Sequence, residues 1–519
     1  MNRGTPFLPR PPRIERRWTT PSGAVVAELT AEARAEDCFA LLAGCPHRLF
    51  FDSARPDHPA GGRVSADTAP RLGRYSFVAA DPIHMLVVPR AADGPAAAAA
   101  GLTTSDRLLA DLRAATIPGL PPFQGGLAGL WSYDVGLALL GLAPPAGQED
   151  IPLMALGAYD VVFAFDHDLT RGWAISQGLP ARGPVARRAR AHDRLDALLA
   201  RLETAAPGPS AAIGPGVGDP SPALPGGGYE LPFHPGVRST HDPAAYRAMV
   251  AQGIELVRAG DIFQVNLAQR LSVAATIDPT RLALAARTHN AAPFAASFEL
   301  DGVQVASMSP ERLLQLRGGT VRMHPIKGTR RVIDQPEADL FAGDDLAASE
   351  KDRAENVMIV DLIRNDLAKV CTPASVRVEA LCRLERYACV QHLVSIVGGR
   401  LRAGVTAGAV LRAALPGGSV TGAPKHRACE IISLLEGSAR GAYCGSLGYL
   451  GFDGSADFNL LIRTFVARPG RIEFAVGGGI TARSDPSAEH AESLHKAEGM
   501  LRVLAGLGLA GAGATGTTA

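Results

Sequence analysis

Lys327 lies in the stretch HPIKGTRR, between an isoleucine and a glycine. A lysine that has lost its proton is a nucleophile, and burial or nearby cations favour the neutral amine. Pro325 restricts the backbone before the lysine, and Arg330 and Arg331 follow it. The same residues are also typical of a strand end followed by a turn with a solvated lysine. The stretch alone leaves both interpretations open.

Two further stretches place acidic residues on one face of an expected helix. In SEKDRAENVMIVDLIRNDL, Asp352 and Glu355 are three positions apart. In SDPSAEHAESLHKAEGMLRVL, an N-cap aspartate and a first-turn proline precede Glu489, Glu492 and Lys496, which fall on one narrow stripe. Carboxylates on two facing helices could hold Mg²⁺, which prefers oxygen ligands. The alternative is a solvated face with ion pairs such as Glu492 with Lys496.

Glycine-rich stretches suggest an anion site. LPGGSVTGAPK, residues 415–425, is not a phosphate-binding loop, because Ala423 and Pro424 separate the second glycine from the lysine. It still predicts a tight turn before a helix whose free N–H groups can bind a carboxylate. In AVGGGIT, residues 475–481, glycines let backbone N–H groups approach a ligand. Arg463, expected at the end of an apolar strand, can clamp a carboxylate or form a surface ion pair.

The elements that must position these residues are strands and long helices. β-branched and aromatic residues predict strands at residues 84–88 and 159–168, and VQVASM and RIEFAV predict strands in the C-terminal half. The alanine-rich residues 185–203 predict a helix. No internal repeat is visible. The mixture is typical of an α+β protein.

Segments poor in core residues divide the chain. Residues 1–20, rich in proline and arginine, are predicted to be a disordered N-terminal extension, and residues 505–519 a flexible tail. The proline- and glycine-rich residues 204–235 are predicted to be a linker. It separates an N-terminal region, 21–203, from a longer C-terminal region, 236–504.

The composition excludes several classes of protein. A length of 519 residues predicts one large composite domain or two. The 52 lysines and arginines nearly balance the 51 aspartates and glutamates, so no global field favours nucleic acid or a membrane surface. The seven cysteines contain no C-x-x-C pair, which suits reduced thiols. Without a signal peptide or a membrane-spanning apolar run, we expect a cytoplasmic protein that binds neither nucleic acid nor membrane.

A series of ordered motifs resembles the chorismate-utilising enzymes, the family of the anthranilate, aminodeoxychorismate, isochorismate and salicylate synthases. The motifs are AGDIFQVNLAQR, SPERLL, HPIKGTRR, KDRAENVMIVDLIRNDL, QHLVS, LPGGSVTGAPK, GSLGYLGF with LIRT, GGGIT and E-x-x-E-x-x-x-K. They cover residues 242–501 densely, and FFDS and GRYSFVAADP continue the match more thinly. The resemblance implies a composite single domain of the α+β class, with two packed antiparallel sheets surrounded by helices and the two regions intertwined.

The resemblance gives Lys327 a role. Anthranilate synthases usually carry alanine at this position, whereas aminodeoxychorismate synthases carry lysine as a covalent nucleophile. By that resemblance, Lys327 attacks C2 of chorismate as the C4 hydroxyl leaves, and ammonia then attacks C4 and expels the lysine. The product is 4-amino-4-deoxychorismate, a precursor of 4-aminobenzoate and folate. Glu311 of SPER matches the glutamate that protonates the departing hydroxyl, and Arg330 and Arg331, if they point inward, would lower the pKa of Lys327.

Further matches describe a metal and substrate site. Glu355 and Glu492 match ligands of Mg²⁺, with Asp352 and Glu489 behind them. His392 of QHLVS matches a histidine near the ring and is counted as catalytic, although a lone histidine is more often structural. The residues matched to substrate binding are Gly328, Thr329, Gly418, Ser419, Thr421, Tyr443, Arg463, Gly477, Gly478, Gly479 and Lys496.

The resemblance also implies partners. No glutaminase motif G-x-C-x-G is present, so ammonia is expected from a separate glutamine amidotransferase subunit in a heterodimer, or from solution. Relatives of this type bind tryptophan through an L-L-E-S-like motif. Here FFDS keeps Ser53, which with Pro293 and Phe294 would form the pocket, while Asp52 and the insertion after Ser53 weigh against tryptophan binding. The alternatives are anthranilate synthase component I, another chorismate enzyme, or a non-catalytic subunit that binds chorismate or an amino acid.

Overall fold

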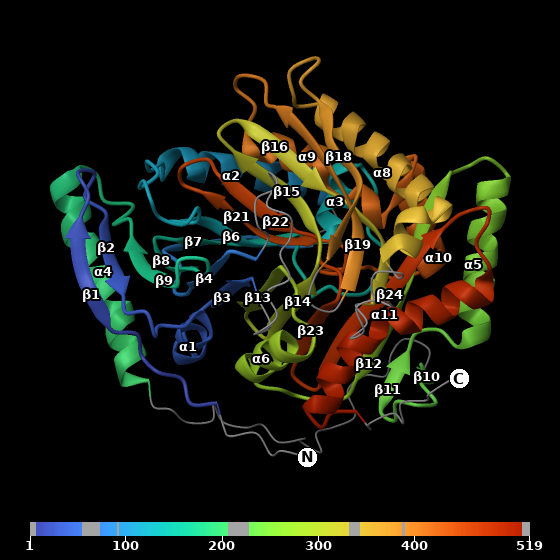
Figure 1. Ribbon diagram of the computed structural model, residues 1–519, viewed down its shortest axis with the longest axis horizontal. Coiled ribbons are helices and arrows are strands. Elements are labelled where there is room, and N and C mark those ends of the chain that lie inside the picture. Colours follow the sequence, from blue (N-terminus) through green and yellow to red (C-terminus); the bar gives the residue numbers. More distant parts are fainter. Residues whose placement is uncertain are drawn as a thin grey trace.

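The computed structural model describes residues 7–53, 73–90, 93–205, 228–331, 343–386 and 390–510. Within these residues, two antiparallel sheets form the centre of the molecule and helices lie outside them (Figure 1). The predicted α+β fold with two packed antiparallel sheets is confirmed. No helix in the described ranges combines the length and the apolar character that crossing a membrane requires.

The first sheet joins strands from both halves of the sequence. In spatial order its strands are β1 (Ile14–Thr19), β2 (Val25–Leu29), β9 (Arg171–Ser176), β8 (Val161–Asp166), β4 (Tyr75–Ala79), β3 (Leu49–Asp52), β13 (Phe294–Leu300), β14 (Val303–Ser309), β23 (Thr464–Arg468), β24 (Arg471–Ile480), β12 (Gln264–Val273), β11 (Val237–Ser239) and β10 (Tyr229–Glu230), with β20 (Gly422–Ala423) beside β12. The halves meet where β3 pairs with β13. The predicted intertwining of the two regions is therefore present.

The second sheet carries the elements around Lys327. Its strands in spatial order are β17 (Ile326–Arg331), β19 (Val390–Arg400), β16 (Thr320–His324), β15 (Arg312–Arg317), β22 (Ala456–Asn459), β21 (Ser446–Gly451), β6 (Gly126–Trp131), β7 (Met154–Tyr159) and β5 (His84–Val88), with β18 (Arg377–Arg386) beside β19. The sheets pack face to face through aromatic rings. Phe77 of β4 and Tyr449 of β21 lie 6.0 Å apart between ring centroids.

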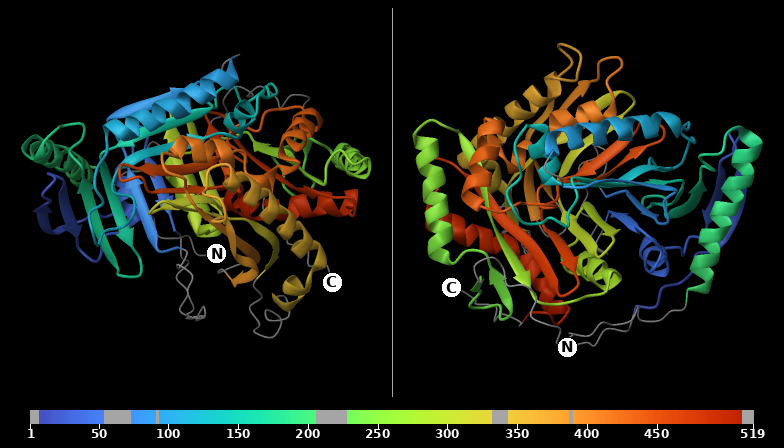
Figure 2. Two further views of the ribbon diagram at one scale, coloured as in Figure 1. Left: turned by 90° about the horizontal axis from the view of Figure 1, so that it is seen from above. Right: turned by 180° about the vertical axis from the view of Figure 1, so that it is seen from behind.

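Helices cover the outer faces of both sheets, as the two views of Figure 2 show. They are α1 (Ala35–Leu41), α2 (Gly94–Asp111), α3 (Tyr133–Leu139), α4 (Pro184–Thr204), α5 (Pro243–Arg258), α6 (Pro279–His289), α8 (Glu350–Ala368), α9 (Ala407–Ala414), α10 (Lys425–Glu436) and α11 (Pro486–Gly506), with the short 3₁₀ helix η1 at Gly418–Val420. Residues of α2, α3, α8 and α9 share one apolar cluster with the second sheet. The remaining helices pack on the first sheet.

Local chemistry sets the starts of the two acidic helices. The Asp485 side chain accepts from the N–H groups of Ser487 and Ala488, as its predicted N-cap role requires. The Ser349 hydroxyl accepts from the N–H of Asp352 in the same way at the start of α8. These caps fix which residues stand in the first turns. The first turns of α8 and α11 therefore present the acidic residues at defined places.

The N-terminal stretch is more ordered than its composition suggests. Strand β1 pairs with β2 from Ile14 opposite Leu29 to Thr19 opposite Val25. The prediction of disorder through residue 20 is thus wrong for β1. Its charged residues suit an edge strand, where side chains such as Arg17, paired with Asp196 at 2.7 Å, face solvent. Residues 1–6 lie outside the described residues.

The other predicted boundaries fall beside gaps in the description. Helix α4 ends at Thr204, and β10 (Tyr229–Glu230) lies inside the predicted linker and pairs with β11 (Val237–Ser239) beyond it, so the linker prediction is wrong for β10. Residues 206–227 and 511–519 lie outside the described ranges. The division into an N-terminal and a catalytic region therefore stays a prediction. The six cysteines in the described ranges are free and buried.

Candidate active site

Lys327 and Glu311 are joined through one serine. The Lys327 Nζ atom donates to the carbonyl oxygen of Ser419 at 3.1 Å. The hydroxyl of Ser419 donates to the Glu311 Oε1 atom at 2.6 Å. The short helix η1 therefore lies between β17 and the β14–β15 junction and holds an amine and a carboxyl within reach of one small molecule.

Glu311 is a buried carboxyl with a fixed backbone. Its side chain lies at the β14–β15 junction, and the residue is only 5% exposed. Its N–H donates to the Ser309 hydroxyl at 3.1 Å, and its carbonyl accepts from the N–H of Leu460 at 3.0 Å. Burial raises the pKa of Glu311 to about 7, although the Ser419 hydroxyl and the Lys327 charge oppose this. Such a carboxyl can donate a proton near neutral pH.

Lys327 has an environment that favours the neutral amine. Burial lowers its pKa, the charges of Glu355 and Glu311 raise it, and the charge of Lys496 lowers it further. Arg330 donates from its Nε atom to Asp345 at 2.9 Å and also lies 3.9 Å from Asp352, so its charge is paired with these two carboxylates. The side chain of Arg331 lies outside the described residues. Lys496 is a cation that lowers the pKa of Lys327 and that the sequence did not indicate for this effect.

His392 lies on β19, which pairs with β17, the strand that carries Lys327. Its Nδ1 atom is 3.3 Å from the carbonyl oxygen of Gly328, so Nδ1 must carry the proton and donate. Burial and the charge of Arg463 lower the pKa of His392 to about 3. The imidazole is neutral at physiological pH and cannot serve as a cationic acid. Gly328 has a φ of 69°, and an added Cβ would lie 2.6 Å from Leu346 Cδ1, so this position requires glycine.

Arg463 was predicted to end an apolar strand, and this is wrong. It precedes β23 with a φ of 52°, a region that arginine rarely adopts. Its carbonyl oxygen accepts from the N–H of Met308 at 3.0 Å, which holds the turn against β14. Strained backbone of this kind is common where a side chain must be aimed at a ligand. The charge of Arg463 contributes to the lowered pKa of His392.

The η1 turn is packed too tightly to vary. An added Cβ at Gly418 would lie 2.7 Å from Leu362 Cδ2 of α8. The hydroxyl of Thr421 donates to the Gly417 carbonyl at 3.0 Å, so its proton serves the turn rather than a ligand. Tyr443 is buried beside the turn. The side chain of Thr329 lies outside the described residues.

Arg440 is a site element that the sequence reasoning missed. Its guanidinium is buried and donates to the carbonyls of Val420 and Asn266, each at 2.9 Å. It also pairs with Glu436 at 2.6 Å and lies over the Tyr443 ring, 5.5 Å from the centroid. One arginine thus ties η1 to β12, α10 and Tyr443. An arginine between a helix end and an apolar strand gives no local signal of this role.

The acidic residues of α11 face the glycine strand β24. Glu489 is buried and accepts from the Ser484 hydroxyl at 2.7 Å, with the Lys351 ammonium 3.5 Å away. Glu492 pairs with Lys496 at 2.8 Å, and Lys496 also donates to the Gly477 carbonyl at 3.1 Å. Burial would raise the pKa of Glu492, but the neighbouring lysines hold it below its usual value.

Glu355 on α8 faces these carboxylates. Burial raises its pKa, and the negative charges of Asp352 and Glu489 act in the same direction, while Lys327 and Lys351 oppose them. Asp352 itself accepts from the Ser349 hydroxyl at 2.7 Å and turns toward the helix start. Lys351 of α8 lies 3.5 Å from Glu489 of α11, so the two predicted acidic helices converge.

The acidic side chains fit a hard divalent cation in donor chemistry but not as a ready-made cluster. No group of three His, Cys, Asp or Glu residues in the described ranges is arranged to hold a metal ion. Glu355, Glu489 and Glu492 nevertheless supply the carboxylate oxygens that Mg²⁺ prefers. Lys351 lies 3.5 Å from Glu489, and Lys496 pairs with Glu492 at 2.8 Å. Mg²⁺ binding by these carboxylates stays a prediction.

The glycines of β24 differ in what a side chain at each position would meet. Gly477 and Gly479 face β12 closely, since an added Cβ would lie 2.0 Å from the Leu267 carbonyl oxygen and 2.0 Å from the Gln264 Nε2 atom. An added Cβ at Gly478 would instead lie 3.2 Å from the Glu489 Oε2 atom and 3.4 Å from the Lys496 Nζ atom. The backbone of all three is paired with β12. The predicted open cradle of N–H groups is therefore a strand whose middle glycine faces the acidic residues.

We expect Gly477→Ala to lower the free energy of unfolding more than Gly478→Ala does. The methyl group at position 477 meets backbone that cannot move aside, so we expect a loss of about 2 kcal/mol or more, as for other overpacked sites. At position 478 the nearest atoms are the ends of the flexible Glu489 and Lys496 side chains, so the loss of stability should be smaller. Urea denaturation followed by circular dichroism measures both variants. Equal losses would contradict this distinction.

The residues predicted for tryptophan lie together at the β3–β13 junction. The Ser53 hydroxyl donates to the Pro293 carbonyl at 3.4 Å. The Phe294 carbonyl accepts from the Asn459 amide at 2.9 Å, and the Arg312 guanidinium lies over the Phe294 ring. Asp52 is held by Arg287 at 2.8 Å. Tryptophan binding there stays a prediction.

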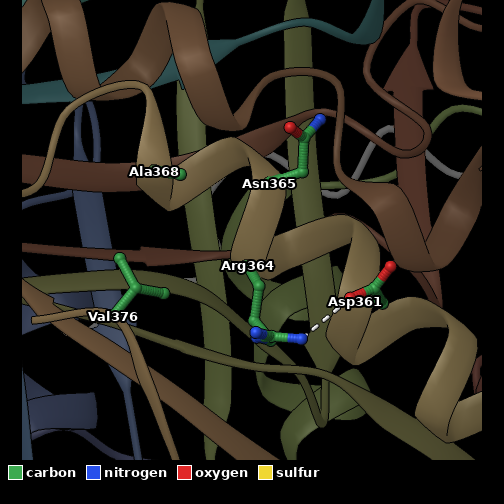
Figure 3. A pocket seen from close by; sticks show the side chains of 5 residues that line it. All are labelled: Asp361, Arg364, Asn365, Ala368 and Val376. Atoms are coloured by element: carbon green, nitrogen blue, oxygen red, sulfur yellow. Dashed lines mark hydrogen bonds and ion pairs between the residues drawn. The ribbon is translucent and has the colours of Figure 1, made fainter. Parts of the chain in front are cut away.

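A surface pocket of about 280 Å³ lies away from these residues (Figure 3). It is lined by Asp361, Arg364, Asn365, Ala368 and Val376. Asp361 and Arg364 form an exposed ion pair at 2.9 Å on the outer face of α8. The buried face of the same helix packs toward the sheet and η1. This pocket is therefore separate from the candidate site.

Comparisons with known proteins and solved structures all point to relatives of one kind. The family described as chorismate binding enzyme matches residues 68–502. Anthranilate synthase component 1 of Streptomyces coelicolor is 38% identical over 88% of this chain and 86% of that protein. Aminodeoxychorismate synthase component 1 of Escherichia coli is 34% identical over 93% of this chain and 99% of that protein. The crystal structure of anthranilate synthase component I from Streptococcus pneumoniae matches with a TM-score of 0.68 and 27% identity, over 86% of this chain and 95% of that chain.

Proposed function

Because the chain belongs to the family of chorismate binding enzymes, we propose that it forms 4-amino-4-deoxychorismate from chorismate and ammonia. The observation that carries this proposal is the placement of Lys327. Its Nζ atom is held by Ser419 beside Glu311. The resemblance of the HPIKGTRR motif implies alanine at this position in anthranilate synthases. An alanine there would leave no nucleophile, so a lysine in this setting supports a covalent route.

The proposed reaction consists of two allylic displacements. The neutral Lys327 amine forms a bond to C2 of chorismate, both conjugated ring double bonds shift by one position, and the C4–O bond breaks. Glu311 gives its proton to the departing hydroxyl, which leaves as water. Ammonia then bonds to C4, both double bonds shift back, and the C2–N bond to Lys327 breaks. The proton released by the new amine returns to the Glu311 carboxylate, so the enzyme is restored.

The other groups would bind the substrate and a cation. Glu355 and Glu492 would hold Mg²⁺, with Asp352 and Glu489 behind them, and the cation when bound would neutralise the ring carboxylate. Arg463 and Lys496 supply positive charge for substrate carboxylates, and a bidentate arginine contact would orient the ring. Tyr443 and the η1 turn would contact the substrate. His392, neutral and bonded to Gly328, orients the strand that carries the lysine.

The ammonia source and the cellular setting belong to the same proposal. The chain carries no glutaminase motif, and the Escherichia coli relative is named component 1. We propose that a separate glutamine amidotransferase subunit supplies ammonia in a heterodimer in the cytoplasm. The product would serve 4-aminobenzoate and folate synthesis.

A second candidate is anthranilate synthase. It is favoured by the 38% identity with the Streptomyces coelicolor protein of that name. At identities of this size, overall similarity does not separate the two products. The products themselves differ in fluorescence and mass, so one assay decides between them.

The purified chain should convert chorismate to aminodeoxychorismate with Mg²⁺ and an ammonium salt at mildly alkaline pH, where more ammonia is free. With glutamine in place of ammonium, the chain alone should form no product. Chromatography with mass detection identifies the product, and fluorescence reports anthranilate. Anthranilate as the main product would contradict the proposed reaction. Turnover with glutamine alone would contradict the proposed partner.

A further inference from the structure

Lys425 ends the glycine-rich stretch LPGGSVTGAPK and has no role in the proposed reaction. It is the first residue of α10 and is only 9% exposed. Its Nζ atom donates to the Oδ2 atom of Asp366, a residue in the last turn of α8 that is 1% exposed, at 2.6 Å. Because both ions lose their hydration, a buried pair is often no more stabilising than apolar side chains of the same size. Stability alone is therefore a weak reason for this pair.

The Lys425 ammonium also reaches the start of the loop that precedes it. Residues 415–424, here called the η1 loop, join α9 to α10 and contain η1. The Nζ atom of Lys425 donates to the carbonyl oxygen of Ala414, the last residue of α9, at the longer distance of 3.5 Å. One ammonium thus joins both ends of the η1 loop and fastens them to α8 through Asp366.

The middle of the η1 loop lies against the same face of α8. Leu362 stands one turn before Asp366 and therefore shares its face of the helix. An added Cβ at Gly418 would lie 2.7 Å from Leu362 Cδ2, so η1 has no free space toward the helix. Ser419, the next residue, makes the contacts to the proposed nucleophile and to the proposed proton donor. A shift of the loop away from α8 would therefore move both contacts of Ser419 at once.

We propose that the Lys425–Asp366 pair is a positioning element of the reaction. It holds the η1 loop against α8 so that Ser419 can contact Lys327 and Glu311 together. The inference rests on the proposed function, which makes these two side chains the nucleophile and the proton donor. Lys425 acts on the site through the backbone of the η1 loop rather than by contact with the substrate.

Four variants separate position from stability. Lys425→Met removes the ammonium and keeps most of the length of the side chain. Asp366→Asn keeps the shape of its side chain and removes only the charge, so it tests the pair even if Lys425→Met does not fold. Lys425→Met combined with Asp366→Leu replaces the pair by apolar side chains, an exchange that often restores stability. Lys369→Met is the matched control, because Lys369 pairs with the other Asp366 oxygen at 3.1 Å but is 54% exposed and lies outside the η1 loop.

Lys425→Met is expected to lower kcat by a factor on the order of 10², the cost of displacing a reacting group by about 1 Å. KM for chorismate should change much less, since Arg463 and Lys496, which are proposed to bind substrate carboxylates, lie outside the η1 loop. The double variant should unfold at nearly the wild-type urea concentration and still be slow, because apolar side chains form no directed bonds to the loop. Asp366→Asn should be intermediate in kcat, and Lys369→Met should match the wild type.

The pH dependence of the rate gives a readout that a loss of stability alone does not move. Donation by the Ser419 hydroxyl lowers the pKa of Glu311 against the effect of burial, and the charge of Lys327 acts in the same direction. If the loop moves and this donation is lost, the pKa of Glu311 rises. At constant free ammonia, the rate should then begin to fall at a higher pH than in the wild type. Ser419→Ala, which removes the hydroxyl, should show this shift, and Lys425→Met should show it too.

The result expected is a double variant with wild-type stability, a low kcat and a shifted pH profile. If Lys425→Met keeps the wild-type kcat, if the double variant regains kcat together with stability, or if the pH profile of the slow variants does not move, the pair is not a positioning element. If the wild type forms no aminodeoxychorismate, or if Lys327→Ala keeps its turnover, the proposed function fails and the role of the pair fails with it.

Discussion

Lys327→Ala is expected to reduce aminodeoxychorismate formation by a factor on the order of 10³–10⁶, as removal of a covalent nucleophile does in other enzymes. No other amine is held between Ser419 and Glu311 in the described ranges. Lys327→Arg should fail as well, because a guanidinium stays protonated and cannot attack. Product formation from chorismate, Mg²⁺ and ammonium, followed by chromatography with mass detection, measures the loss.

Lys327→Ala should still bind its ligands, because the groups proposed for them lie on other elements. Arg463 precedes β23, and Glu492 lies on α11. Chorismate binding by calorimetry and thermal unfolding should therefore stay close to the wild type. Lys369→Ala, at the far end of α8, is the matched control and should keep its activity. Undiminished turnover by Lys327→Ala would exclude covalent catalysis.

Glu311→Gln is expected to lower the rate by a factor of about 10²–10⁴, the usual contribution of a general acid. The pKa of Glu311 is raised to about 7, so its proton is present below that pH and is lost as the pH rises through it. At constant free ammonia, the wild-type rate should therefore fall above about pH 7. The glutamine variant cannot titrate and should lack this limb of the profile. Because Lys327 and Glu311 interact, the limb reports the pair.

The same variant should change stability with a defined sign. A carboxyl whose folded pKa is raised stabilises the fold below its unfolded pKa, and this contribution is lost as the pH rises through about 7. Glu311→Gln should therefore gain stability over the wild type at alkaline pH more than at acidic pH. Urea denaturation at one acidic and one alkaline pH measures the difference in the free energy of unfolding between the variant and the wild type. If the rate of Glu311→Gln still fell above about pH 7, the role given to Glu311 would be contradicted.

Local chemistry made part of the site predictable. The caps at Ser349 and Asp485 and the spacing of Glu489, Glu492 and Lys496 depend on neighbours within one helical turn. The sequence alone could therefore predict the starts and acidic faces of α8 and α11. The packed sheets followed from the resemblance, since no local pattern shows that β3 pairs with β13 across the chain.

Contacts between distant segments account for the differences. The apolar residues before Arg463 look like a strand, but the backbone leaves the ladder and adopts a positive φ at Arg463. Strand β1 looks disordered by composition and is held by backbone pairing with β2, which composition does not report. Arg440 and Lys351 contact groups far away in sequence, on β12 and α11. Only the folded chain shows those partners.

The most direct test of the central claim is the mass of the enzyme after exposure to chorismate and Mg²⁺ without ammonia. The first displacement can then occur while the second cannot. Rapid acid quenching, digestion and mass spectrometry should find the peptide with Lys327 heavier by one chorismate less one water, and Lys327→Ala should carry no such adduct. An unmodified Lys327 peptide, in an enzyme that forms aminodeoxychorismate once ammonium is added, would contradict the covalent mechanism.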